Sequence, residues 1–402
     1  MTDPKSLKVN RTEATKLVKQ LLAIPGKSGE EAEVAQVVRQ HLIDAGVPTG
    51  WISSDKAYRQ CKIEGSTTGN LIVNFPGTVK APRRMLMAHM DTVPICVGCK
   101  PVKKGTKFVS QGEKTGLGAD DRAGVAVVLN TAKQIMQKKL AHPPLTFLFS
   151  VQEEVGLQGA RHIQLSKLKK PKLAFNWDGG NPYKLTVGAI GGYRMSIDIH
   201  GIASHAGVAP EKGASAVSIA ALAIAKLHEE GWLGKVEKSQ GTGTSNIGVI
   251  SGGSATNVVV DHVRVLAEAR SHNIKFMKRI VKEIEKQFKW AAKQVKNANG
   301  KSGRVEFEGQ IDYEPFKLPD SDPSLATAER MIQGLGEESV RTIANGGLDA
   351  NWLFKHGVPT VSLGCGQLNQ HMVTEQLEIP WYLAACQIAL HLAAGEEANG
   401  GT

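Results

Sequence analysis

Two short segments of the sequence place acids and a histidine where buried strands should end. Glu153 and Glu154 follow the apolar run LTFLFS after two intervening residues. If both stayed in the strand, one would point into the core without a partner, so the strand should end before them. His89 and Asp91 close the segment MLMAHMD in the same way, and a carboxylate so near can orient an imidazole that binds metal. Both segments therefore supply groups that could bind a cation or move a proton.

Three further segments add the same kinds of side chain. TGLGADDRAG carries Asp120 and Asp121 through a glycine-rich turn into the start of a helix, where they could also simply cap the helix. Asp178 follows the strand LAFNW, and His371 lies beyond the strand PTVSLG. Ligands of open α/β sheets bind at the carboxyl ends of the strands. We therefore expect the side chains of all five segments to meet at one edge of a sheet.

The donors collected in this way are imidazoles and carboxylates, without thiolates. Such nitrogen and oxygen ligands suit zinc, and cobalt or manganese could substitute for it. Because a carboxylate can bridge two cations, the set could hold two divalent metal ions about 3.5–4 Å apart, as in dinuclear hydrolases. One of the two adjacent glutamates would then bind metal, and the other would be left as a general base.

The elements around these segments predict an α/β fold. Up to about residue 190, and again from about residue 314, short apolar strands alternate with amphipathic helices. This alternation predicts a discontinuous catalytic domain, residues 1–190 and 314–402, with a mostly parallel sheet covered by helices. Residues 191–313 instead show the order β-α-β-β-α-β of a ferredoxin-like unit. We predict that this unit is a domain inserted into the first.

Composition narrows the classes of function. The 402 residues are 41% hydrophobic, which is enough for two domains with cores of their own. The net charge of +11 is spread along the chain without interleaved aromatic residues, so we expect no nucleic-acid partner. The longest apolar stretch is too short to span a bilayer, and the N-terminal residues lack the apolar region of a signal peptide. We therefore expect no membrane association and a cytoplasmic location.

The cysteines point to a reducing compartment. There are five, an odd number, and they are scattered, which argues against a disulfide framework. Cys96 and Cys99 form one CxxC pair. Without a second pair, this motif is more simply a feature of a loop than a zinc or redox site.

Taken together, HMDTVP, LGADDRAG, the glutamate pair, WDGG and His371 resemble the motifs of a known family in their order and spacing. This is the dinuclear metallopeptidase family of peptidase T, glutamate carboxypeptidase and the aminoacylases, and the resemblance is strongest to the peptidase T-like members. It implies an exopeptidase for short peptides, expected to be an aminopeptidase. A carboxypeptidase or an N-acyl-amino-acid amidohydrolase is the alternative within the family. A non-catalytic binding protein on the same fold is a second alternative, although no expected ligand is missing.

The resemblance also assigns roles to individual residues. It implies that the metal ligands are His89, Asp120, Glu154, Asp178 and His371. Asp120 would bridge the two metals, Asp91 would orient His89, and Glu153 would be the general base. The peptide bond between Asp120 and Asp121 should be cis, although no proline follows it.

The inserted unit carries further positions of the resemblance. GIASHAG matches the lid motif of the family, whose histidine, here His205, stabilises the oxyanion. Asn257 and Arg270 resemble residues that hold a substrate carboxylate. Peptidase T has an arginine where this sequence has Asn345, so the clamp carries one cation instead of two. In the family this unit is a lid and dimerisation domain, which also suggests a homodimer.

Overall fold

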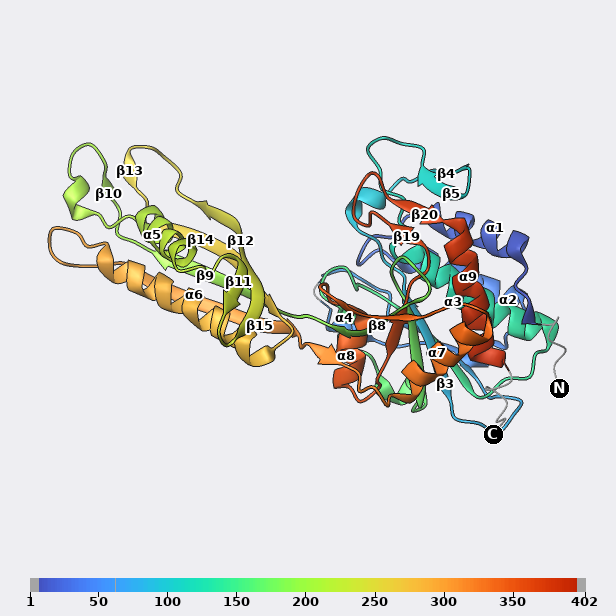
Figure 1. The fold of residues 1–402 in the computed structure, drawn as a ribbon. Coiled ribbons are helices and arrows are strands. Elements are labelled where there is room, and N and C mark those ends of the chain that lie inside the picture. The colour runs from blue at the N-terminus through green and yellow to red at the C-terminus, as the bar shows by residue number, and fades with distance from the viewer. Residues whose placement is uncertain (1–6, 62, 396–402) are drawn as a thin grey trace. The chain divides into compact units, whose positions relative to one another are not determined.

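The structure is a computed structural model, and it describes residues 7–61 and 63–395. These residues fall into two compact units (Figure 1). Unit 1 contains the described parts of residues 1–188, 317–344 and 348–402, and unit 2 contains residues 189–316 and 345–347. Each unit has its own sheet, so each is described by itself.

Unit 1 is built on a mixed sheet of nine strands within the described residues. Along the sheet these are β1 (Ile52–Ser54), β2 (Leu71–Phe75), β6 (Leu145–Ser150), β3 (Arg84–His89), β7 (Leu173–Trp177), β18 (Val361–Leu363), β8 (Lys184–Ala189) and β16 (Phe316–Lys317), with β17 (Val340–Ala344) also paired to β8. The central strands β6, β3, β7 and β18 are parallel, whereas β2 runs antiparallel to β6 and β8 runs antiparallel to β18. The predicted α/β fold with a mostly parallel sheet is confirmed.

Helices cover the sheet of unit 1. They are α1 (Arg11–Leu22), α2 (Ala32–Asp44), α3 (Ala119–Lys138), α4 (Gln158–Arg161), α7 (Pro323–Gly334), α8 (Asp349–Lys355) and α9 (Ile379–Ala394). Helix α3 packs on β3 and β7 and is itself contacted by α1, α2 and α9. It is therefore buried over most of its length, as its apolar and small residues require.

A smaller sheet of unit 1 was not predicted from the sequence. It pairs β4 (Pro101–Lys104), β5 (Lys107–Ser110), β20 (Gln376–Glu378) and β19 (Gln367–Leu368) in the order β19-β20-β5-β4. Strands of two to four residues are too short to show a clear alternation of apolar and polar side chains. The loop between β19 and β20 carries His371, so this small sheet anchors one of the predicted ligands.

Unit 2 has the strand order of the predicted ferredoxin-like unit, with one strand added. The strands of its main sheet are β9 (Gly191–His200), β11 (Gly234–Lys238), β12 (Gly241–Gly252), β14 (His262–Ser271) and β15 (Arg304–Tyr313), in the order β11-β12-β14-β9-β15. All neighbouring pairs are antiparallel. Helices α5 (Ala216–Glu229) and α6 (Ile274–Gln294) pack side by side over this sheet (Figure 1). Strand β11 is the addition, because it extends the sheet as a hairpin with β12.

The parallel strands of unit 1 decide where the predicted site lies. Strands β3, β6, β7 and β18 end next to one another, because they are neighbours that run in the same direction. Residues that follow these strands therefore share one edge of the sheet. Among the described residues, none of the helices combines the length and the apolar character that crossing a membrane requires.

Candidate metal centre

His89 is the last residue of β3 and lies at the centre of the cluster. Its side chain is 3% exposed, its Nδ1 lies 3.3 Å from Oδ1 of Asp91, and its Nε2 lies 3.2 Å from Oδ1 of Asp120. Burial by itself lowers the pKa of His89, but the two carboxylates outweigh it and leave the pKa well above its usual value. The ring is therefore held between two acids, and its Nε2 is directed at Asp120.

Asp91 is fully buried and is held by donors on every side. Its Oδ2 accepts a hydrogen bond from the Ser28 hydroxyl at 2.7 Å, and the backbone N–H groups of Glu153 and Glu154 donate to its two oxygens at 3.0 and 3.2 Å. Burial would raise the pKa of Asp91, but His89 and these donors lower it below the usual value. An ionised Asp91 thus orients the His89 ring and fixes the backbone of the glutamate pair.

The start of α3 brings two adjacent aspartates to different places. The peptide bond between Asp120 and Asp121 is cis, as the resemblance implied. Asp121 points inward: its oxygens accept hydrogen bonds from the backbone N–H groups of Gly124 and His89, at 3.0 and 3.1 Å, and from Gln367 Nε2 at 2.8 Å. Asp121 therefore caps the helix and binds neighbouring segments, while Asp120 faces the histidines.

Asp120 presents one carboxylate oxygen to each of two histidines. Oδ1 lies 3.2 Å from Nε2 of His89, and Oδ2 lies 3.4 Å from Nε2 of His371. Burial would raise the pKa of Asp120, but the two imidazoles lower it below its usual value. Two imidazoles that face opposite oxygens of one carboxylate form an arrangement suited to a bridging ligand.

Glu154 and His371 lie together next to Asp120. The Nε2 of His371 is 2.9 Å from the carboxylate of Glu154. The acids Asp120 and Glu154 raise the pKa of His371 to about 10. Burial raises the pKa of Glu154, and the nearby Asp120 raises it further, against the effect of His371. The side chains of the predicted metal ligands Glu154 and His371 are thus brought together.

Glu153 and Asp178 occupy the side of the cluster next to His89. Burial raises the pKa of Glu153 well above its usual value, and the charges of Glu154, Asp349 and Asp178 raise it further. Burial and the nearby Asp120 raise the pKa of Asp178 to about 7. Burial is the main cause of these shifts, and repulsion between the neighbouring carboxylates adds to it.

The donor set fits divalent metal ions. Three overlapping groups each place their ligand atoms within 4.8 Å of one another: His89, Asp120 and Glu154; His89, Glu153 and Asp178; Asp120, Asp121 and Asp178. All donors are imidazole nitrogens or carboxylate oxygens, which zinc, cobalt and manganese accept. A cation placed among them would also remove the repulsion that raises the carboxylate pKa values. The residues present can therefore hold metal.

Several contributors to the cluster were not assigned a role from the sequence. Glu375, four residues after His371, accepts three backbone hydrogen bonds from the loop that carries Asp120. Asp349, in the segment NGGLDANW, is buried beside the cluster, accepts a hydrogen bond from Ser150 at 2.5 Å and has a pKa raised to about 6 by burial. Ser28 binds Asp91. The sequence around a single polar residue in a loop or at the start of a helix does not indicate which distant segment its side chain will contact.

In unit 2, the predicted residues His205 and Asn257 lie together. His205 belongs to β10 (Ser204–His205), which pairs with β13 (Val258–Val259), and the backbone carbonyl of Asn257 accepts from the N–H of Ala206 at 2.9 Å. The Nδ1 of His205 accepts hydrogen bonds from the backbone N–H groups of Gly207 and Val208, at 3.2 and 3.1 Å. In the neutral ring the proton is therefore on Nε2, which makes this exposed atom a donor.

Arg270 lies at the other end of β14 from Asn257. From His262, the first residue of this strand, to Arg270 is roughly 26 Å at the usual rise per residue. The structure of one chain therefore does not bring Asn257 and Arg270 to a common carboxylate. Arg270 donates through Nε and Nη2 to both oxygens of Glu268, at 2.9 and 3.0 Å. Asn345 instead lies by His272, with 3.0 Å between its Oδ1 and the ring Nε2.

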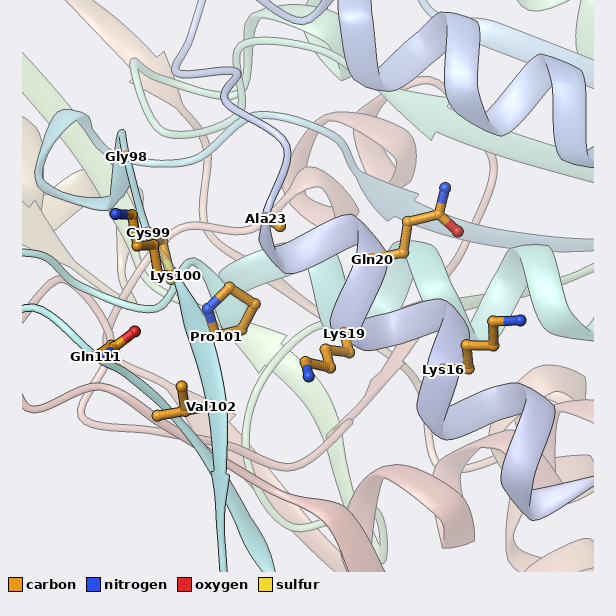
Figure 2. Close-up of a pocket in the computed structure, with 10 residues that line it drawn as sticks. All are labelled: Lys16, Lys19, Gln20, Ala23, Gly98, Cys99, Lys100, Pro101, Val102 and Gln111. Carbon is orange, nitrogen blue, oxygen red and sulfur yellow. The ribbon is translucent and has the colours of Figure 1, made fainter.

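The CxxC pair and a nearby hollow lie outside the metal cluster. Cys96 and Cys99 are buried, and burial raises the pKa of both thiols, so neither is poised as a thiolate. A hollow of about 700 Å³ lies between α1 and residues 98–102, and its lining includes Lys16, Lys19 and Lys100 (Figure 2). None of the predicted ligands lines it. We therefore assign the chemistry to the cluster.

Comparisons with known proteins agree on one family. Residues 85–395 match the family described as Peptidase family M20/M25/M40. The uncharacterized protein YqjE of Bacillus subtilis is 34% identical over 363 residues, which are 90% of this chain and 92% of that protein. The structure of aminopeptidase PepT from Bacillus cereus is 31% identical, with a TM-score of 0.81 and coverage of 96% of this chain and 99% of that one. A tripeptidase from Staphylococcus aureus is 29% identical, with a TM-score of 0.85 and coverage of 97% and 99%.

The crowded carboxylates predict that divalent cations stabilise the protein. Zinc at about 100 times its dissociation constant should raise the free energy of unfolding by about 2.7 kcal/mol, and a chelator should remove this gain. Because the pKa of Asp178 is about 7 without metal, protons compete with the cation below that pH. The gain should therefore shrink as the pH falls from 8 to 6. Urea unfolding with zinc or with chelator at both pH values measures it.

A matched pair of variants makes this measurement specific. His371→Ala removes an imidazole from the cluster and should reduce the gain from zinc. His356→Ala removes a histidine that lies 3.1 Å from the carbonyl of Arg161, away from the cluster, and should keep the gain. Equal stability of the unaltered protein in zinc and in chelator would contradict the assignment of a metal centre.

Proposed function

Because the chain belongs to the M20/M25/M40 peptidase family, we propose that it is a metal-dependent exopeptidase that hydrolyses short peptides as an aminopeptidase or tripeptidase. One observation carries the proposal: every residue of the expected ligand set is present in the sequence, four of them lie in clusters of possible metal ligands, and His371 contacts two of these four. The likeness to a B. cereus aminopeptidase and an S. aureus tripeptidase over nearly the whole chain supports this specificity.

We propose that two divalent cations, zinc in the first instance, are held by His89, Asp120, Glu154, Asp178 and His371. Asp120 would bridge them, since its two oxygens face different histidines. When bound, the cations would polarise the substrate carbonyl and lower the pKa of the attacking water. Asp91 would keep the His89 ring in place, through the contact with Nδ1.

Glu153 is the proposed general base. Of the two adjacent glutamates, Glu154 contacts His371, whereas Glu153 lies on the side of His89 and Asp178. A carboxylate with a raised pKa can take a proton from water and hold it long enough to pass it to the leaving amine. His205 would donate from Nε2 to the oxyanion that forms, because its Nδ1 is already engaged by backbone N–H groups.

For the substrate, we propose that Arg270 binds the terminal carboxylate of a short peptide. Because Nε and Nη2 of Arg270 already donate to Glu268, the substrate carboxylate would have to accept from Nη1 or displace Glu268. Asn257 would then act beside His205 instead of with Arg270. The five cysteines are free of disulfides, which supports the cytoplasm as the site of action.

We also propose a homodimer formed through unit 2. Val217 and Leu222 on α5, and Val249 and Ile250 on β12, expose between 41% and 54% of their surface. Strand β11 pairs with β12 only up to Ser245, so the rest of this edge of β12 has no partner strand among the described residues. Exposed apolar side chains beside an open strand edge favour pairing with a second copy.

The two glutamates should respond differently to loss of charge. Glu153→Gln should lower kcat by about 10²–10⁴-fold or more while the metal content stays near that of the unaltered protein, since a base is lost and no ligand. Glu154→Gln should reduce bound metal. Metal analysis of both purified variants, together with kcat, distinguishes the roles, and equal metal loss in both would contradict them.

The end of the substrate that must be free can be tested with blocked peptides. An aminopeptidase should release the N-terminal residue of an unblocked tripeptide and fail on its N-acetylated form. Equal cleavage of the N-acetylated form would instead favour the carboxypeptidase or amidohydrolase alternative. Identification of the products by mass spectrometry, with zinc- or cobalt-loaded protein, decides between these activities.

The same peptides test the role of Arg270. Because a charge-assisted hydrogen bond contributes about 1.5–3 kcal/mol, Arg270→Ala should lower kcat/KM by roughly 10–100-fold on peptides with a free carboxylate. On C-amidated peptides the variant should lose little further activity, because the partner of the guanidinium is already absent. Equal harm to both kinds of peptide would make Arg270 a structural residue.

The homodimer can be tested by sedimentation equilibrium. The unaltered protein should sediment as a dimer at micromolar concentration, and Ile250→Lys should shift it to the monomer by placing a charge in the apolar contact. Val340→Lys, which alters an equally exposed side chain of unit 1, is the control and should remain a dimer. A monomeric unaltered protein would refute this part of the proposal.

A further inference from the structure

A buried glutamate, Glu375, binds a loop that is distant in the sequence. Its Oε2 accepts hydrogen bonds from the backbone N–H groups of Leu117 and Gly118, at 2.8 and 2.6 Å, and its Oε1 accepts from the N–H of Asp120 at 2.9 Å. The side chain of Glu375 is only 1% exposed. The Glu375 carboxylate therefore binds the backbone of Asp120, the proposed bridging ligand, and of two residues just before it.

The thiol of Cys96 is a fourth donor to this carboxylate. Its Sγ lies 3.6 Å from Oε2 of Glu375. A Cβ on Gly116 would lie 2.9 Å from this sulfur and 3.3 Å from Oε2, so only glycine lets the backbone pass so close. Gly118 has a φ of 74°, a conformation that glycine adopts without steric cost. The loop is thus shaped so that its N–H groups converge on one carboxylate.

The backbone of Asp120 is held from both sides. Glu375 binds its N–H, and the next residue, Asp121, accepts from the N–H groups of Gly124 and His89. Glu375 also follows His371 in the loop between β19 and β20. One carboxylate therefore connects the loop that carries Asp120 to the loop that carries His371.

We infer that Glu375 is a positioning residue of the metal centre, which fixes the backbone of Asp120 and holds the loops of Asp120 and His371 together. The inference rests on the proposed function, because it gives Asp120 and His371 the roles of ligands. Glu375 contacts the backbone of Asp120 and acts only through it. Mutation of a residue that orients a metal ligand typically lowers metal affinity or activity by 10–100-fold.

Glu375→Gln tests the inference with almost no change of shape. The amide NH₂ would replace one acceptor oxygen and would face backbone N–H groups, so at least one hydrogen bond is lost. We expect zinc affinity, measured by competition with a chromophoric chelator, to fall by about 10–100-fold. The visible absorption bands of the cobalt-loaded protein should also shift, because they report the arrangement of the ligands.

Glu378→Gln is the matched control. Glu378 lies three residues further along and pairs with Lys107 at 2.9 Å, outside the loop of Asp120. Its zinc affinity and cobalt spectrum should equal those of the unaltered protein. Equal affinities and spectra for Glu375→Gln and Glu378→Gln would overturn the inference and leave the proposed function standing. An unaltered protein that binds no zinc and cleaves no peptide would overturn the proposed function, and the inference with it.

A milder pair of variants covers the case in which Glu375→Gln does not fold, as judged by circular dichroism. Cys96→Ala removes only the thiol donor and should lower zinc affinity by less than about tenfold. Cys99→Ala alters the other cysteine of the pair, which lines the hollow in Figure 2, and should leave zinc affinity unchanged. Zinc affinity of Cys96→Ala equal to that of Cys99→Ala would then count against the inference.

Discussion

Mutual repulsion among carboxylates at one edge of the parallel sheet is the constraint on which the site depends. Burial and neighbouring charges raise the pKa values of Glu153, Glu154 and Asp178. Water cannot screen these charges there, so backbone N–H groups, imidazoles and cations must compensate them. Asp91 and Asp120 are compensated within the chain, and both have lowered pKa values. The raised pKa values of Glu153, Glu154 and Asp178 indicate that these acids are not fully compensated, and a bound cation would supply the rest.

The fold supplies this compensation with backbone groups as much as with side chains. Parallel strands end at one edge, and the N–H groups that follow β6 donate to Asp91. The N–H groups of Leu117, Gly118 and Asp120, just before and at the start of α3, donate to Glu375. The N–H of Gly124, further along the helix, donates to Asp121. Because backbone donors cannot move independently of the sheet and the helix, the carboxylates they bind are held in place. The rigidity of the site follows from the secondary structure around it.

The sequence predicted site residues correctly where a charged residue ends an apolar strand, because few structural roles fit such a position. The strand ends located His89, the glutamate pair and Asp178, because a charged side chain without a partner is costly in the apolar core and therefore marks the end of a buried strand. No sequence pattern indicated the role of Glu375, because the backbone N–H groups that it binds lie more than 250 residues away. No pattern indicated that the length of β14 would separate Asn257 from Arg270. Long-range pairing and strand length are decided by packing, which a local pattern does not record.

We propose that Asp120 stands between two metal ions. The most direct test is the anomalous X-ray scattering of crystals grown with zinc, measured on both sides of the zinc absorption edge. Two peaks about 3.5–4 Å apart should flank the Asp120 carboxylate, one beside His89 and Asp178 and the other beside His371 and Glu154. A single peak, or peaks that do not contact Asp120, would contradict this proposal.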